Sequence, residues 1–170
     1  KVYARTAAGG SYFSTSAGSP RFIGIHRDIW EGQQARFVLQ DECLPLFAGV
    51  WLVPETVYGG PFANPETNLL RKVGQDRFEP DDFSHEQSLV LESARGVVVF
   101  NSCSHGGIVN IVQGVKEQLQ RPVYAVVGGL HMFSRTAQSG MNCTPEYVRS
   151  VANALMEEGV EKVYTGHCTG

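Results

Sequence analysis

Three apolar runs that each lead into a loop containing glycine and histidine constrain the fold of this chain most. The runs cover residues 97–100, 123–127 and 160–164. An apolar, β-branched run that stops at glycine indicates a buried strand ending in a turn where the backbone passes closely. If the three strands share a sheet and point the same way, their loops lie at one edge, where α/β folds bind ligands and metals. The pattern therefore predicts an α/β fold with a functional site at one sheet edge.

The loops that follow these runs carry nitrogen and sulfur donors. The first loop holds Cys103 and His105, the second holds His131, and the third holds His167 beside Cys168. Imidazole and thiolate groups together favour a divalent transition metal, with zinc first and manganese or iron as alternatives. Any one of these histidines alone could be an ordinary turn residue, and only their recurrence in the same context favours a metal. In the first loop, either donor or both could ligate.

Composition argues against several classes of protein. The net charge is −3 and no basic stripe is visible, which argues against a nucleic-acid partner. No apolar stretch is long enough to span a bilayer, and no signal-peptide pattern opens the chain. The four cysteines form no CxxC pair, as expected for reduced thiols of a cytoplasmic protein, although an extracellular origin stays open. We therefore expect a small-molecule substrate, and neither a nucleic acid nor a membrane.

The chain, 170 residues long, is expected to form one domain with three sections. Residues 1–60 are predicted to be β-rich, with short strands throughout 21–60. Residues 61–81 are rich in turn-forming residues and are predicted to form a long surface loop. Residues 82–170 are predicted to form a hairpin, with strands at 88–91 and 97–100, followed by strand–helix repeats.

Two amphipathic helices are predicted between the histidine-bearing loops. Their apolar periodicity extends over residues 108–119 and 145–158. The second helix has a marked start, because Thr144 is a good N-cap and Pro145 suits the first helical position. Gly159 suits its C-terminal end. We expect these helices to cover the outer face of the sheet.

Four motifs, in this order along the chain, resemble the metallo-β-lactamase superfamily. They are HEQSLVL at 85–91, GVVVFNSCSHGGIVNI at 96–111, GGLH at 128–131 and GHCTG at 166–170. The chain is most similar to the branch of metal-dependent hydrolases related to dihydropterin-ribofuranosyl-aminobenzene-phosphate synthase. The resemblance implies an αβ/βα sandwich with a mono- or dinuclear metal site at one edge of the sheets. It also implies a metal-bound hydroxide that attacks an ester, amide or phosphodiester-like bond.

The resemblance also implies roles for individual residues. His85 stands where the third-motif histidine of the superfamily falls. Cys103 stands where an aspartate or cysteine ligates or bridges the metals, with His105 as its nearby competitor. His167 matches the last-motif histidine. His131 belongs to the pattern of this branch and is expected to face the substrate or a metal, which makes it the candidate catalytic residue.

The superfamily's His-x-His-x-Asp-His loop, which supplies ligands to both metals, does not occur in this sequence. The chain starts at Lys1 without a methionine and stops at Gly170 inside a glycine-rich turn. We therefore expect a fragment whose sandwich is incomplete at the N-terminus and also at the C-terminus. Such a chain should bind metal weakly, and whether it is itself an enzyme is left open.

Two functional classes remain after this reading. In the first, the parent protein is a metal-dependent hydrolase that acts on a small ester, amide or phosphate-containing substrate. In the second, the chain is a non-catalytic module that has lost the His-x-His-x-Asp-His loop and binds a small anion or a partner. The start and end of the chain favour the first class. We also expect apolar sheet surface to be exposed, and hence dimerisation or association with an N-terminal segment.

Overall fold

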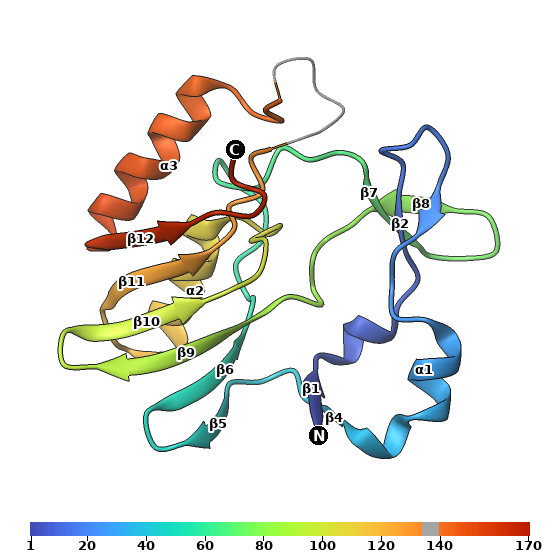
Figure 1. The fold of residues 1–170 in the computed structure, drawn as a ribbon, viewed down its shortest axis with the longest axis horizontal. Helices are drawn as coiled ribbons and strands as arrows, with labels where there is room; N and C mark the ends of the chain where they lie inside the picture. Colours follow the sequence, from blue (N-terminus) through green and yellow to red (C-terminus); the bar gives the residue numbers. More distant parts are fainter. Residues whose placement is uncertain (134–139) are drawn as a thin grey trace. The chain divides into compact units, whose positions relative to one another are not determined.

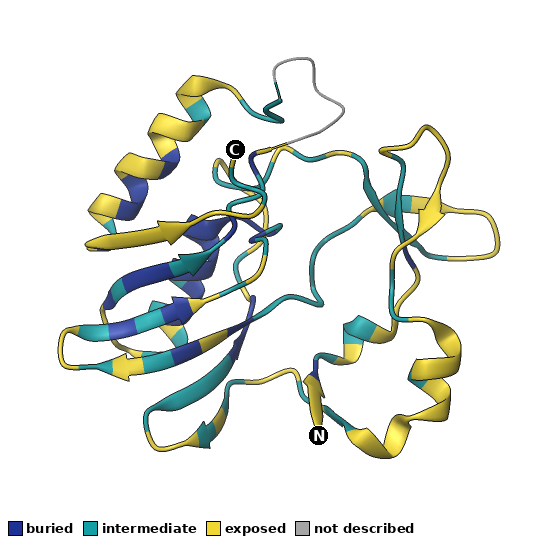
Figure 2. Ribbon diagram, in the orientation of Figure 1, coloured by how far each residue is buried: buried dark blue, intermediate teal, exposed yellow. Residues whose placement is uncertain are grey.

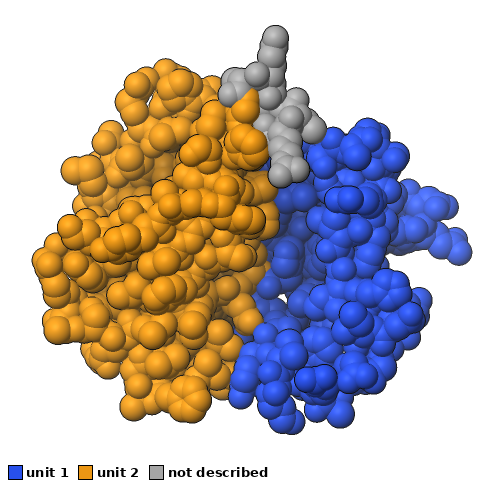
Figure 3. All heavy atoms as spheres, viewed as in Figure 1, with its two compact units in different colours: residues 1–41, 66–85 blue, residues 42–65, 86–170 orange. Residues whose placement is uncertain are grey.

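The computed structural model describes residues 1–133 and 140–170, and these residues form two compact units (Figure 3). Unit 1 contains Lys1–Asp41 and Glu66–His85, and unit 2 contains Glu42–Pro65 and Glu86–Gly170. Unit 2 carries the three histidine-bearing loops.

Unit 2 is built on a six-stranded sheet with the strand order β12-β11-β10-β9-β6-β5 (Figure 1). The strands are β5 (Leu44–Phe47), β6 (Val50–Pro54), β9 (Gln87–Ser93), β10 (Gly96–Phe100), β11 (Val123–Gly128) and β12 (Lys162–Thr165). Strand β10 pairs in parallel with β11, and β11 pairs in parallel with β12. The prediction that the three apolar runs share one sheet and one direction is therefore confirmed, as is the β9–β10 hairpin.

The sheet of unit 2 buries one face much more than the other (Figure 2). Val97 and Val99 of β10 are fully buried, whereas Phe100 at the end of the same strand is 37% exposed. All four residues of β12 are exposed, because this strand lies at the edge of the sheet and pairs only with β11 among the described residues. Apolar side chains alternate between a covered face and an exposed face.

Two helices lie on the covered face of this sheet. Helix α2 (Ile108–Leu119) has the predicted bounds, and α3 (Pro145–Glu157) ends one residue before the predicted end. The Thr144 hydroxyl accepts a hydrogen bond from the amide of Tyr147 at 3.2 Å, which confirms the predicted cap. Helix α2 contacts β6 and β11 and is buried along most of its length, while α3 packs against α2 through one face only.

Unit 1 contains two small sheets and one short helix. Its elements are β1 (Val2–Ala4), η1 (Thr6–Gly9), β2 (Tyr12–Ser14), β3 (Arg21–Phe22), α1 (Arg27–Gly32), η2 (Gln34–Arg36), β4 (Phe37–Leu39), β7 (Leu69–Lys72) and β8 (Phe78–Pro80). Strand β1 pairs with β4, and a four-stranded sheet has the order β3-β2-β7-β8. Aromatic packing supports that sheet, because the ring of Phe13 makes edge contacts with Phe22 and Phe78.

Two predicted sections need correction. Residues 21–60 are not all β, because α1 occupies Arg27–Gly32, where Trp30 packs its ring 4.9 Å from that of Phe37. Residues 61–81 are not simply a loop, because β7 and β8 form there. Strand β7 pairs with β8 in a local hairpin and with β2, which is distant in sequence, and no local pattern indicates the pairing with β2.

Within residues 1–133 and 140–170, the structure contains no helix whose length and apolar character would allow it to cross a membrane.

Glu158, directly after α3, joins the two helices of unit 2. Its Oε1 accepts a hydrogen bond from Nε2 of Gln113 at 2.8 Å, and its Oε2 accepts one from Nζ of Lys116 at 2.6 Å. The hydrogen bonds from Lys116 and Gln113 hold the pKa of Glu158 below its ordinary value. The charged form of this carboxylate therefore stabilises the folded state.

We predict that Glu158→Gln lowers the free energy of unfolding at pH 7 by about 1 kcal/mol. The loss is no larger because Lys116 is partly exposed and solvent screens its attraction to Glu158. Because the pKa of Glu158 is lowered by folding, this stabilisation is present above the unfolded-state pKa of about 4.3 and is lost as the pH falls through the folded-state pKa. Urea denaturation at pH 7 and pH 3 measures the difference. Glu157→Gln is the control, because Glu157 is exposed and its replacement should change the free energy of unfolding little. An equal loss at both pH values would contradict the charge argument.

Candidate metal centre

The loops that follow β10, β11 and β12 are joined by hydrogen bonds at one edge of the unit 2 sheet. The amide of Gly129 donates to the carbonyl of Ser102 at 2.8 Å, which ties the second loop to the first. The amides of Met132 and Phe133 both donate to the carbonyl of Cys168 at 2.9 Å, which ties the third loop to the second. The parallel strands therefore deliver three loops to one place, and main-chain hydrogen bonds hold them together.

Two sets of metal-binding donors gather where these loops meet. Donor atoms of Cys103, His105 and His131 lie within 4.8 Å of one another, and the same is true of Cys103, His167 and Cys168. The rings of His105 and His131 are 4.3 Å apart between centroids, and Nε2 of His167 is 3.1 Å from Sγ of Cys103. The structure thus brings together four of the five predicted site residues. Cys103 takes part in both sets.

His85 lies in unit 1, not in the unit that carries the donor sets. Its Nδ1 is 3.7 Å from Oδ1 of Asp81, and its ring packs 4.4 Å from that of Tyr12. His85 is therefore a half-buried histidine that packs against an aromatic ring. Its role as a metal ligand stays a prediction.

Glu86 supports the first donor set, and sequence analysis did not select it. Its Oε1 accepts hydrogen bonds from the amide and from Nδ1 of His105, both at 2.9 Å, and its Oε2 accepts one from the amide of Gly106 at 2.8 Å. Burial opposes ionisation, but the hydrogen bonds and the nearby imidazole of His105 bring the pKa of Glu86 below its ordinary value. Metal-binding histidines commonly donate their second N–H to such a carboxylate.

Three residues in these loops adopt left-handed backbone conformations although they are not glycine. They are Ser104, His131 and His167, with φ angles of 55°, 48° and 51°. Such conformations persist where surrounding contacts enforce them, and they concentrate at functional sites. The carbonyl of His131 accepts hydrogen bonds at 2.9 Å from the side-chain amides of Asn64 and Asn142. The hydroxyl of Ser104 donates to the carbonyl of Gly129 at 2.6 Å.

Gly128 and Gly129 make the close approach of the loops possible. A Cβ on Gly128 would lie 2.1 Å from the carbonyl oxygen of Asn101, at a φ of +151°. A Cβ on Gly129 would lie 2.7 Å from Sγ of Cys168 and 2.8 Å from the carbonyl oxygen of Ser102. A side chain at either position would push the second loop away from the first, and at Gly129 also away from the third.

The thiol of Cys103 is protonated under ordinary conditions. Burial, the neighbouring Cys168 thiol and the Glu86 carboxylate together raise the pKa of Cys103 to about 12. A metal that uses this sulfur as a ligand must therefore displace its proton.

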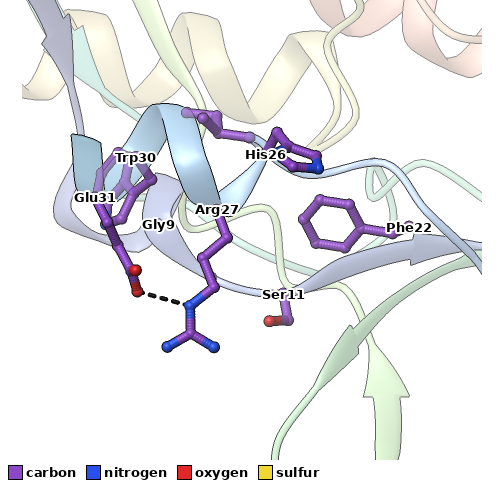
Figure 4. A pocket seen from close by; sticks show the side chains of 9 residues that line it. Gly9, Ser11, Phe22, His26, Arg27, Trp30 and Glu31 are labelled. Atoms are coloured by element: carbon purple, nitrogen blue, oxygen red, sulfur yellow. Dashed lines mark hydrogen bonds and ion pairs between the residues drawn. The ribbon is translucent and has the colours of Figure 1, made fainter. Parts of the chain in front are cut away.

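Cavities occur in both units. In unit 1, a cavity of about 610 Å³ is lined by Gly9–Ser11, Phe22, Ile25–Arg27, Trp30 and Glu31 (Figure 4). It contains His26, whose side chain is 68% exposed, and Arg27, which is paired with Glu31 at 2.7 Å. It holds no set of metal donors among the described residues, so its size does not make it the better candidate.

In unit 2, an apolar cavity of about 400 Å³ lies between α3 and β12 and reaches the residues next to the donor loops. Its lining includes Leu130, Met132 and Thr169, each of which neighbours a donor residue. This cavity could hold an apolar part of a substrate whose reactive group faces the donors.

Cys168 was the second omission of the sequence analysis, which noted the thiol beside His167 but did not select it. Its position directly after a predicted ligand was the available signal, as was the position of Glu86 directly after His85. The roles of both residues became visible only in the tertiary structure. Glu86, which precedes β9, contacts the loop that follows β10, and Cys168 lies close to Cys103 at the edge of the sheet.

The fold agrees with a solved structure of known class. No protein-family model matches the chain. The crystal structure of a metal-dependent hydrolase of the β-lactamase superfamily superposes on 99% of the chain and 60% of its own, with a TM-score of 0.77 and 24% identity. This protein therefore has a metallo-β-lactamase-like α/β fold, as predicted.

A sequence relative agrees with that assignment. The chain is 31% identical over 138 residues to 7,8-dihydropterin-6-methyl-4-(beta-D-ribofuranosyl)-aminobenzene-5'-phosphate synthase of Methanocaldococcus jannaschii. The match covers 79% of this chain and 44% of the synthase, so the chain spans about half the length of this curated relative. Together with the likeness in fold, this match supports the predicted relationship to the metallo-β-lactamase superfamily.

We predict that Glu86→Gln weakens zinc binding by about 10- to 100-fold, because the carboxylate that orients His105 is replaced by a neutral amide. Competition titration against a chromogenic chelator measures the affinity, and thermal unfolding confirms that the variant is folded. Glu92→Gln, on strand β9, which begins directly after Glu86, but paired with Arg121 at the surface, is the matched control and should bind zinc normally. Equal affinities for the two variants would show that Glu86 does not orient the ligand.

Proposed function

We propose that this chain carries the metal centre of a metal-dependent hydrolase that acts on a small ester, amide or phosphate-containing substrate. The observation that carries the proposal is the pair of donor sets that share Cys103, each gathered within 4.8 Å. The fold likeness to a metal-dependent hydrolase supports the same class of reaction. The sequence relative is named as a synthase, so relatives of this fold differ in reaction, and the substrate must come from experiment.

The chemistry of the donors fits zinc better than a hard cation. Imidazole nitrogen and thiolate sulfur are ligands that zinc and iron accept readily, whereas magnesium and calcium prefer oxygen. Cys103, His105 and His167 are the proposed ligands in unit 2, with Cys168 added from the structure. Manganese and iron remain the alternatives to zinc.

The residues around the donors have separable tasks in this proposal. A bound divalent metal would lower the pKa of a coordinated water and polarise the substrate. Glu86 orients the His105 ring and holds the proton of its Nδ1 atom. His131 is the proposed catalytic residue, because its ring lies against His105 while its backbone is clamped by two asparagine side chains. The apolar cavity beside Leu130 would hold the non-reacting part of the substrate.

The cellular setting and the partners belong to the same proposal. All four cysteines are free thiols, which suits a reducing compartment such as the cytoplasm. Leu89 and Phe100 are each 37% exposed on neighbouring sheet strands, and Tyr164 on β12 is 59% exposed. These exposed apolar side chains support association through the sheet, either with a second copy or with an N-terminal segment.

Removal of the shared donor provides the sharpest test. We predict that Cys103→Ser lowers zinc affinity more than His105→Ala or His167→Ala, because only Cys103 contributes to both donor sets. Calorimetric titration of the reduced chain with zinc, and then with manganese, measures the affinities. His26→Ala is the matched control, since this imidazole is exposed in unit 1, and it should leave zinc binding unchanged. Equal zinc affinity in all four variants and the wild type would overturn the proposed metal centre.

Activity separates the two functional classes. Zinc-loaded protein should hydrolyse a chromogenic ester, amide or phosphodiester, and His131→Ala should reduce turnover while zinc stays bound. A non-catalytic module would instead bind the metal or a small anion and turn over none of these substrates.

A further inference from the structure

Cys103 and Cys168 form a thiol pair within the donor cluster. Their sulfur atoms are no more than 4.8 Å apart, and Sγ of Cys168 lies 3.9 Å from the carbonyl oxygen of Cys103. The two residues are 65 positions apart in sequence and meet because β10 and β12 flank β11 on either side. A disulfide needs sulfur atoms about 2 Å apart, so side-chain rotation and a small loop movement would close the gap.

The surroundings of the pair allow a small oxidant to reach it. Both cysteines are only half-buried, and His167, which lies 3.1 Å from Sγ of Cys103, is exposed. The other two cysteines have no such partner within the donor clusters found among residues 1–133 and 140–170. Cys43 packs against the hydrophobic core of unit 2, and Cys143 directs its thiol to the carbonyl of Met132.

We propose that peroxide converts Cys103 and Cys168 into a reversible disulfide, and that this bond closes the donor cluster to metal. In the first step, one of the two cysteines loses its proton and the thiolate sulfur attacks the peroxide. The O–O bond breaks, a sulfenic acid forms, and the released hydroxide takes up the proton as water. In the second step, the other thiol displaces the sulfenic hydroxyl as water and the S–S bond forms. The thiol pair loses two electrons, one peroxide is reduced to two waters, and a dithiol reverses the reaction.

The effect on metal binding follows from the position of Cys103 in both donor sets. A disulfide sulfur is not a thiolate, and the thiolate is the form of cysteine that ligates metals. One bond would therefore remove a ligand from the His105–His131 set and two ligands from the His167 set. This part of the inference rests on the proposed metal centre, whereas disulfide formation itself does not.

Thiol counting on the metal-free chain tests the disulfide. The reduced 170-residue protein is treated with a chelator and hydrogen peroxide, denatured, alkylated, and examined by intact mass and peptide mapping. Two of the four thiols should resist alkylation, a Cys103–Cys168 linked peptide should appear, and dithiothreitol should restore all four. Cys143→Ser is the matched control and should form the same link, whereas Cys103→Ser and Cys168→Ser should not. Full alkylation, a link through Cys43 or Cys143, or over-oxidation without a link would overturn the proposal.

Zinc titration of the oxidised and reduced chains tests the consequence. Zinc affinity should fall on oxidation by at least about tenfold, the smallest loss expected for removing even a supporting group of a metal site, and should return with dithiothreitol. Zinc bound beforehand should keep all four thiols alkylatable after the same exposure. If the link forms but the reduced chain binds no zinc, the proposed metal centre fails and the thiol pair stands. Undiminished zinc binding by the linked protein would overturn the closing of the site.

Discussion

The parallel pairing of β10, β11 and β12 is the interaction on which the rest of unit 2 depends. Val99 pairs with Val126, which pairs with Val163, so the three strands end at the same level of the sheet. Their loops therefore begin side by side, whatever side chains they carry. The buried face of the same strands packs against α2, whose first turn begins directly after the loop that holds Cys103 and His105. Core packing and site geometry thus share one scaffold.

Hydrogen bonds from polar side chains near the sheet edge hold the loops of the donor cluster in place. Glu86 precedes β9 and clamps the loop that follows β10, and the Ser104 hydroxyl bonds to the loop that follows β11. These contacts offset the strain of left-handed residues at Ser104, His131 and His167.

The sharing of Cys103 links the possible chemistries of this site. One sulfur lies in both donor sets and beside a second thiol, so the proposed metal ligation and the proposed oxidation would compete for the same atom. The similar structure is described as a metal-dependent hydrolase and the sequence relative as a synthase, and the fold alone does not choose between such reactions. In our proposal, the apolar cavity beside α3 contributes to the choice of substrate.

Local patterns determined the helices at 108–119 and 145–157, because apolar periodicity and the Thr144 cap act over a few residues. The same local logic placed Cys103, His105, His131 and His167 at strand ends, and parallel pairing then brought them together. Only the tertiary structure decided that β7 pairs with the distant strand β2, and that β12 is exposed because it lies at the edge of its sheet. It alone also revealed Glu86 and Cys168. Their hydrogen bonds and thiol contacts join residues that are distant in sequence and come close only when the chain folds. No periodicity along the sequence indicates such contacts.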